Sequence, residues 1–298
     1  MYTIHRWSRQ DAVKPFELLL FSICVPTIKQ AVENGVDGII VDWEFRGKAE
    51  RQRGADTQIN QDTLEDLLRV RAATSATVIV RINGFGDATE YEIEMAISAG
   101  ADEVLLPMVT TPDQAAATLE MVRGRAGVGI LVETLDGAAC AAELGRLALR
   151  RVYVGLNDLA IQRRSAHIFE PIVDGLLEAI RGKFQCPFGF GGLTLPEKGR
   201  PIPCRLLMGE MAGMATSFCF LRRSFLADTG GHPTFTAIQS IRREMAAMYA
   251  RSAAAVERDA AALRQAIELL SVCSPGSQPD LQTATCRRIL TCSESPPG

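Results

Sequence analysis

The amino-acid sequence predicts a single (β/α)8 TIM barrel with an extra long C-terminal helical segment. The main observation is a set of short runs that are apolar on both faces and rich in Val, Ile, Leu and Phe. Strands of a parallel sheet are buried on both faces and have this composition. The runs lie at residues 18–25, 37–43, 77–83, 102–109, 128–134, 151–156, 187–192 and 216–221.

Helical segments separate most of these runs. Residues 26–34 begin with Pro26, which suits a first helical turn, and end before Gly35. Thr111 is a plausible N-cap for the helix that follows it. Further helices are predicted at 62–73, 88–98, 112–123, 136–147 and 168–182. The alternation favours a closed barrel over an open doubly wound sheet, and no GxGxxG motif follows the first run.

The chain is expected to divide into a barrel core at 1–232, a helical extension at 233–271 and a disordered tail at 272–298. The tail is rich in Ser, Pro and Thr. The extension is longer than one closing helix needs, and we expect it to form a homo-oligomer. The alternative is that it packs back on its own barrel. Its apolar residues at helical spacing are Ile238, Ile241, Met245, Met248 and Tyr249.

The bulk composition is that of an ordinary globular protein. Of 298 residues, 47% are hydrophobic and 22% charged, and the net charge of −3 gives no support for nucleic-acid binding. No run of about 18 apolar residues predicts a membrane span, and the polar N-terminus lacks a signal peptide, so we expect a cytoplasmic protein. The eight cysteines form no CxxC pair and suggest reduced thiols.

Polar residues and glycines end several of the apolar runs. The carboxyl ends of the strands form the active-site face of a TIM barrel, so these side chains are expected to converge on one rim. They are Asp42, Glu44, Arg81, Asn83, Glu133, Thr134, Asn157, Asp158, Gly191 and Gly192.

A rim with several carboxylates and few cations predicts a divalent metal. Mg2+ favours one or two carboxylates plus waters and substrate oxygens, which Glu133 and Asp158 could provide. Arg81, expected to be unpaired, could then hold a substrate carboxylate in a bidentate fork. Each residue also has a structural interpretation. Asp158 or Asn157 could cap a helix, Asp42 and Glu44 could pair with Arg46 or Lys48 at the surface, and Arg81 could be a structural ion-pair partner.

Other catalytic devices find less support. His5, His167 and His232 do not lie at strand ends, so neither a Ser/His/Asp nor a Cys/His arrangement is indicated. None of the lysines lies inside an apolar run, which argues against a Schiff-base mechanism.

Five motifs, in order, resemble the HpcH/HpaI aldolase and citrate lyase beta-subunit family of the phosphoenolpyruvate/pyruvate barrel superfamily. The likeness covers roughly residues 17 to 225. The motifs are GVDGIIVDWE (35–44), VIVRIN (78–83), AGADEVLLPMV (99–109), ILVETLDGA (130–138) and VGLNDLA (154–160).

The resemblance implies Mg2+ (or Mn2+) bound by Glu133 and Asp158, with Arg81 on a carboxylate or enolate oxygen of the substrate. It implies a metal-dependent carbon–carbon lyase or aldolase that acts on a 2-oxo acid through a pyruvate-type enolate, or on a citrate/malyl-type substrate. We expect further catalytic or substrate-binding roles for the remaining strand-end residues. These are Asp42 and Glu44 (catalytic) and Asn83, Gly191 and Gly192 (substrate-binding).

The sequence departs from the aldolase branch at one position. That branch carries an acid/base histidine directly after the acidic pair of strand two, whereas this chain has Phe45. The citrate lyase branch lacks the histidine as well, so the expected fold and metal site are unaffected. The identity of the acid/base group stays open. Alternative functions are other enolate or phosphoenolpyruvate chemistry, (thio)ester hydrolysis, or a non-catalytic barrel subunit.

Overall fold

Parallel strands form a nearly closed barrel in the computed structural model, which describes residues 16–51 and 60–273. Each strand except β8 begins within one or two residues of the start of a predicted apolar run, and the predicted α/β barrel is confirmed. The strands are β1 (Glu17–Phe21), β2 (Gly38–Asp42), β3 (Thr77–Arg81), β4 (Glu103–Leu106), β5 (Gly127–Val132), β6 (Arg151–Val154), β7 (Phe188–Phe190), β8 (Gly192–Leu193) and β9 (Phe218–Leu221).

The seventh predicted run is divided into two strands at Gly191. The sheet order is β7-β6-β5-β4-β3-β2-β1-β9-β8, so β7 pairs with β6 while β8 pairs with β9. Gly191 has a φ of +62°, a left-handed conformation that glycine adopts without the penalty of a Cβ. The short segment around Gly191 therefore connects the two ends of the sheet and nearly closes the barrel.

The strands alternate side chains between two apolar layers. In β1, for example, Leu19 and Phe21 belong to the cluster inside the barrel, while Leu18 and Leu20 belong to the layer between strands and helices. The inside cluster consists of Leu19, Phe21, Ile40, Ile79, Leu105, Leu131, Tyr153, Phe218 and Phe220. The barrel interior is thus a packed core, and a site can form only at its ends.

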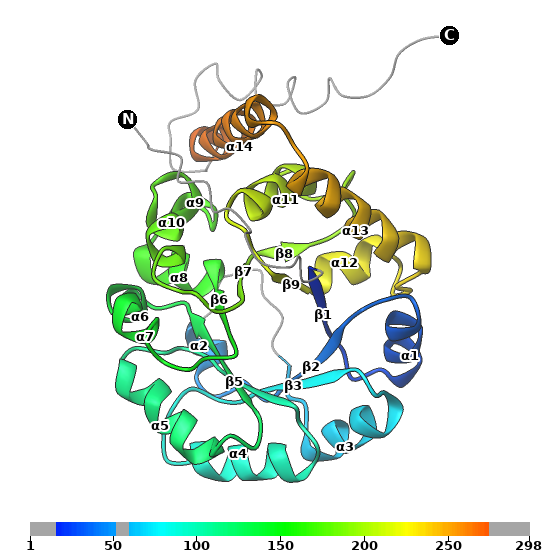
Figure 1. Cartoon of the computed structure of the whole chain (residues 1–298), viewed down its shortest axis with the longest axis vertical. Helices are drawn as coiled ribbons and strands as arrows, with labels where there is room; N and C mark the ends of the chain where they lie inside the picture. The colour runs from blue at the N-terminus through cyan, green and yellow to red at the C-terminus, as the bar shows by residue number, and fades with distance from the viewer. Residues whose placement is uncertain (1–15, 52–59, 274–298) are drawn as a thin grey trace.

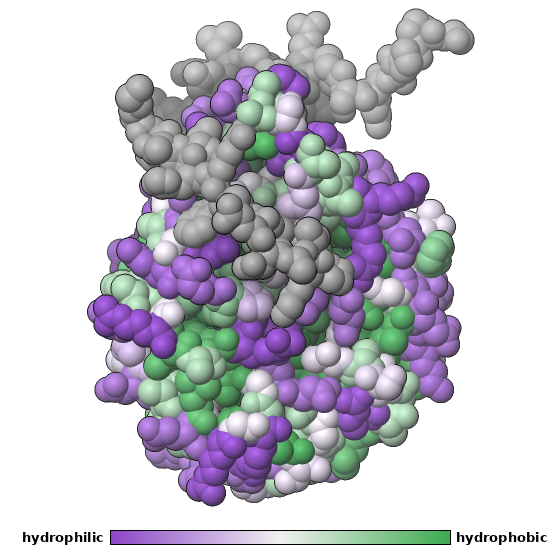
Figure 2. Space-filling view, in the orientation of Figure 1, coloured by the Kyte–Doolittle hydropathy of each residue, from purple (hydrophilic) through white to green (hydrophobic). Residues whose placement is uncertain are grey.

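Helices surround the strands (Figure 1). Figure 2 shows hydrophilic residues over much of their visible outer surface, with apolar residues between them. No described helix combines the length and the apolar character that a membrane span needs. The helices are α1 (Val25–Glu33), α2 (Lys48–Arg51), α3 (Leu64–Ala73), α4 (Thr89–Ser98), α5 (Pro112–Val122), α6 (Leu135–Ala139), α7 (Ala141–Leu144), α8 (Leu156–Arg163), α9 (Glu170–Val173), α10 (Leu176–Arg181), α11 (Cys204–Gly213), α12 (Arg223–Asp228), α13 (Phe235–Tyr249) and α14 (Ala253–Cys273).

Helix starts follow their local sequence. Thr63 accepts a hydrogen bond from the backbone N–H of Asp66, and the Asp66 carboxylate accepts one from the Thr63 N–H, which completes a capping box at α3. Thr111 occupies the predicted N-cap position of α5, although its side chain makes no capping hydrogen bond.

The predicted helical extension consists of two helices with different surroundings. The apolar face of α13 is buried in the chain's own core through Ile238, Ile241, Met245 and Met248. These side chains are therefore not available to contact a second subunit. The homo-oligomer is still a prediction, but the apolar face of α13 no longer supports it. The second helix, α14, lies outside the ring of barrel helices, next to α9 and α11 (Figure 1). The predicted tail falls outside the described residues apart from the end of α14.

Buried charges close the amino end of the barrel. Arg151, at the start of β6, donates to Glu103 of β4 and to Glu17 of β1, with N···O distances of 2.7 Å in both cases. Its guanidinium also lies 4.9 Å from the ring centroid of Phe218. This end is therefore filled by side chains that neutralise one another.

Candidate active site

At the carboxyl ends of β2 and β3, Arg81 forms a bidentate ion pair with Asp42. Arg81 Nε lies 2.8 Å from Asp42 Oδ1, and Nη2 lies 2.6 Å from Oδ2. Both side chains are buried. Although burial opposes ionisation, the Arg81 guanidinium holds the pKa of Asp42 below its usual value. The expectation that Arg81 is unpaired is therefore wrong, because the rim carboxylates of β2 surround it.

A chain of alternating charges continues from Glu44 into α2. Glu44 Oε2 lies 3.1 Å from Arg81 Nη1 and 2.9 Å from Lys48 Nζ. Glu44 Oε1 accepts a hydrogen bond from Arg51 at 2.6 Å, and Arg51 Nε donates to Asp158 Oδ1 at 2.9 Å. The predicted pairing of Glu44 with Lys48 is found, but both residues are buried and not at the surface.

Lys48 is a buried amine that the sequence analysis did not place in the site. Its Nζ also lies 3.6 Å from Asp42 Oδ2, yet it forms no hydrogen bond of good geometry with any residue that the structure describes. Burial and repulsion from Arg81 lower its pKa despite the neighbouring carboxylates. Lys48 lies four residues after Glu44, and this spacing indicated that the two side chains pair. The sequence did not indicate that Lys48 is buried.

Glu133, at the end of β5, is a buried carboxylate with few hydrogen bonds to stabilise its negative charge. Within the described chain, its one hydrogen bond comes from the backbone N–H of Met108, 3.0 Å from Oε1. A Cβ at Gly155 would lie 2.3 Å from Glu133 Oε2, so glycine there leaves the space in which this oxygen sits. Burial, with repulsion from Glu44 and Asp158, raises the pKa of Glu133 to about 8.

Asp158 lies in the first turn of α8, close to Glu133. The N-cap of α8 is Gly155, so Asp158 is not the capping residue. Its carboxylate is nearly buried and accepts the hydrogen bond from Arg51. The structure thus brings Glu133 and Asp158 to adjacent strand ends, as the sequence predicts, and adds an arginine that already holds one of them.

The side chain of Asn83 forms hydrogen bonds within the rim. Its Oδ1 accepts hydrogen bonds from the backbone N–H groups of Phe45 and Arg46, at 3.1 and 2.9 Å, and its Nδ2 donates to Glu92 at 2.9 Å. Arg46 also pairs with Glu92 and not with the β2 carboxylates. Asn83 therefore fixes the loop after β2, and its expected role in substrate binding is still a prediction.

Aromatic rings form the floor of the rim. Tyr153 stacks on Phe220 with centroids 3.9 Å apart, and Phe21 meets Phe220 edge-on at 5.2 Å. The Tyr153 hydroxyl donates to the backbone carbonyl of Gly191 at 2.9 Å. Gly191 thus borders this floor, whereas Gly192 is exposed.

A second arginine, Arg222, reaches the same floor from the residue after β9. Its Cζ lies 4.7 Å from the centroid of the Phe21 ring, and the Cζ of Arg81 lies 5.1 Å from that centroid. Sequence reasoning missed Arg222, although it directly follows the apolar run at 216–221. Its position at a strand end was the available signal.

Residues 24–158 match the family described as HpcH/HpaI aldolase/citrate lyase. This match confirms the resemblance that the sequence predicts. The matched residues begin before α1 and end at Asp158, so they include Asp42, Glu44, Arg81 and Glu133.

Solved structures with the same fold include a protein of the HpcH/HpaI family. A family protein from Burkholderia cenocepacia J2315 aligns with a TM-score of 0.56 and 14% identity over 77% of this chain and 95% of that one. The citrate synthase SbnG aligns with a TM-score of 0.53 and 13% identity over 72% and 89%. A 3-hexulose-6-phosphate synthase aligns with a TM-score of 0.53 and 18% identity over 77% and 99%. At these identities the likeness shows the fold alone.

The rim at the carboxyl ends of the strands fits a hard divalent cation through Glu133 and Asp158. Glu133 Oε2 lies in the space that Gly155 leaves and accepts no hydrogen bond from the described residues. A cation would offset the repulsion that raises the pKa of Glu133. The described residues hold no group of three or more His, Cys, Asp or Glu side chains arranged as a metal cage. Mg2+ needs fewer protein ligands than that, because water and substrate oxygens complete its shell.

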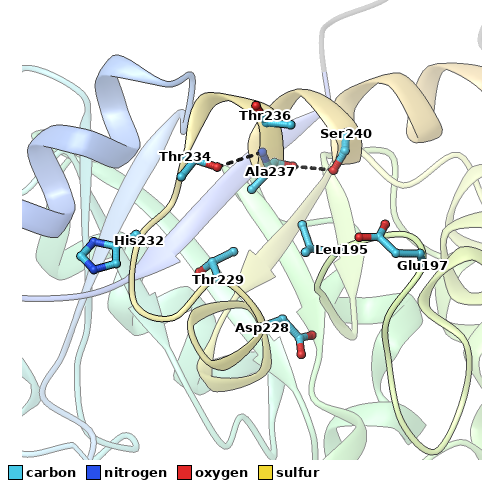
Figure 3. Close-up of a pocket in the computed structure, with 9 residues that line it drawn as sticks. All are labelled: Leu195, Glu197, Asp228, Thr229, His232, Thr234, Thr236, Ala237 and Ser240. Atoms are coloured by element: carbon cyan, nitrogen blue, oxygen red, sulfur yellow. Dashed lines mark hydrogen bonds between the residues drawn. The ribbon is translucent and has the colours of Figure 1, made fainter.

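A separate pocket of about 270 Å³ lies between α12, α13 and the loop after β8 (Figure 3). Its lining includes Glu197, Asp228 and His232, and none of the strand-end residues described above. In Figure 3 the His232 ring points away from Asp228 and Glu197. His232 therefore lies at this outer pocket and not among the carboxylates of the rim.

Proposed function

We propose that this protein is a divalent-metal-dependent carbon–carbon lyase or aldolase that acts on a 2-oxo acid or a citrate/malyl-type substrate. Aldolase and citrate lyase chemistry is what the family match suggests. The observation that carries the proposal is the buried Glu133 beside Asp158 and Glu44, a set of carboxylates that repel one another. Mg2+ or Mn2+ bound to Glu133 and Asp158 would offset this repulsion.

The metal, when bound, would polarise the substrate carbonyl and stabilise enolate charge. Arg81 would present N–H groups to the developing negative charge. Asp42 is then a positioning residue, because two hydrogen bonds fix the orientation of the Arg81 guanidinium. Glu44 supports the same orientation from the other side. The aromatic floor would exclude water from one side of the substrate.

Arg51 would couple metal binding to the position of α2. In this structure its guanidinium bridges Glu44 and Asp158, so it holds a carboxylate that the metal would need. We propose that Arg51 gives up Asp158 when the metal binds and keeps its contact with Glu44.

Phe45 supports the alternative of another enolate reaction on the same scaffold. Its side chain is 46% exposed and has no group that can carry a proton. An enzyme without this proton carrier could still form an enolate while cleaving no carbon–carbon bond. The expected binding of a small 2-oxo or acyl substrate is common to both functions.

A metal-dependence assay tests the proposal. The full chain with Mg2+ is expected to release pyruvate from 4-hydroxy-2-oxo acids or oxaloacetate and to exchange the methyl protons of pyruvate with deuterium. EDTA, Glu133→Gln and Asp158→Asn should abolish both reactions, whereas the exposed Glu94→Gln should not. Exchange without cleavage would support the alternative enolate chemistry. Full activity in EDTA would refute the metal-dependent function.

A further inference from the structure

Arg222 is a half-buried arginine that pairs with no acidic side chain of residues 16–51 and 60–273. Among the described residues, no side chain or carbonyl forms a hydrogen bond or an ion pair with its guanidinium, which contacts the Phe21 ring. Other arginines that are buried to a similar or greater degree differ in this respect. Arg151 pairs with two carboxylates, and Arg181 donates to two backbone carbonyls.

An arginine in such a place is costly unless a ligand satisfies it. The guanidinium has five N–H donors, and the half-burial of Arg222 removes part of their water without supplying an acceptor from the described residues. Contact with the Phe21 ring offsets only part of this cost. Consistent with this, burial and repulsion from Arg81 lower the pKa of Arg222.

The surroundings of Arg222 favour an anion over a neutral ligand. Arg81 and Arg222 lie over the same Phe21 ring, but Asp42 and Glu44 already neutralise Arg81. Within the described part of the chain, the positive charge of Arg222 is therefore the one without an ion pair at this side of the rim. Tyr153, whose hydroxyl is occupied by Gly191, lies near enough to interact electrostatically with both Arg222 and Glu133.

We propose that Arg222 binds a carboxylate or phosphoryl group of the ligand above the Phe21 ring. Arg222 presents a planar fork of donors, which matches two oxygens of either group. If the bound anion is part of the substrate, this site belongs to the proposed function and rests on it. Binding of the anion itself needs neither metal nor turnover.

Calorimetry with malonate and with inorganic phosphate, each in EDTA and in Mg2+, tests the site. The full-length wild-type chain is expected to bind at least one of them, and the tighter ligand identifies the carboxylate or the phosphoryl source. Arg222→Gln should weaken that binding at least about 10-fold. Arg223→Gln, an exposed neighbour of equal charge, should bind as the wild type does. Failure of the wild type to bind either anion, or equal binding by Arg222→Gln, would overturn the proposal.

Chemical protection gives a readout that needs no variant. Phenylglyoxal modifies accessible arginines, and peptide mass spectrometry follows Arg222 and Arg223 separately. The bound anion should slow modification of Arg222 at least about 10-fold, at saturating anion, and leave Arg223 unchanged. Equal rates with and without anion would count against the site. If anion binding at Arg222 holds in EDTA while no variant or condition reveals Mg2+ binding, then the metal-dependent function fails and the anion site stands.

Discussion

Asp42 and Arg81 occupy the same register position on the neighbouring strands β2 and β3, and their side chains form a bidentate ion pair. The pair is buried, with 0% and 4% of the respective side chains exposed. Register thus places a carboxylate beside the one arginine of the RIN motif. The consequence is that Asp42 and Arg81 act as a unit, and a change in either one affects the other.

Asp42→Asn should strongly destabilise the fold and reduce activity. The substitution leaves Arg81 buried with less negative charge around it, and breaking a buried pair from one side costs about 3–5 kcal/mol. Urea denaturation of the metal-free chain measures the loss. The exposed Glu94→Gln, which breaks the surface pair with Arg125, should change the unfolding free energy little. If the two substitutions lowered the unfolding free energy by similar amounts, the buried Asp42–Arg81 pair would stabilise the fold no more than a surface pair does.

Arg81→Lys should weaken the proposed reaction at least about 10-fold in kcat/KM, since a charge-assisted bidentate contact contributes about 1.5–3 kcal/mol. A lysine cannot hold both oxygens of Asp42 and also face the substrate. Because neither Glu133 nor Asp158 is hydrogen-bonded to Arg81, Mg2+ affinity should change little. Wild-type kcat/KM on every active 2-oxo acid would make Arg81 a purely structural residue.

The sequence predicted the strands well because their signal is local. A run that is apolar on both faces needs no knowledge of its partners, and β2 and β3 lie within the runs at 37–43 and 77–83. Short helices were harder to predict. The four-residue α2 has too few residues for a helical pattern, yet it delivers Lys48 and Arg51 to the site.

Site pairings were less predictable because they depend on distant segments. The convergence of Glu133 and Asp158 follows from their strand ends alone. By contrast, the contact between Arg51 and Asp158 joins residues 107 positions apart, and no local pattern indicates it. Arg81 was expected to be unpaired and is not, whereas Arg222 has no ion pair with any residue that the structure describes. Arg222 directly follows the apolar run at 216–221. A search for polar residues after every predicted strand would therefore have included it.

Leu263→Ala should destabilise the chain by about 2–4 kcal/mol without changing its mass in solution. Leu263 and Ile267 of α14 are buried against Phe169 and Ile202 of the same chain. The loss would therefore come from packing within one subunit. Gln265→Ala, on the exposed side of α14, is the matched control and should have little effect. A change in mass by light scattering for Leu263→Ala alone would instead place α14 between subunits.

Glu133→Gln should stabilise the metal-free chain at alkaline pH. The pKa of Glu133 is raised from 4.5 to about 8, so the folded chain keeps a proton that the unfolded chain loses near pH 4.5. Stability therefore declines as pH rises from about 4.5 to about 8, and the full penalty is present above pH 8. Glutamine carries no charge and can still accept the Met108 N–H, so it avoids this decline.

Thermal or urea unfolding in EDTA at pH 5 and pH 9 measures the effect. At pH 9 the Glu133→Gln chain should be more stable than the wild type by at least ~1 kcal/mol, and at pH 5 the difference should be small. Millimolar Mg2+ should reverse the order at pH 9, because the cation stabilises only the chain that retains the Glu133 carboxylate. The same pH dependence in both chains would show that Glu133 ionises freely in the fold. In that case the repulsion between carboxylates would no longer support a metal at this rim.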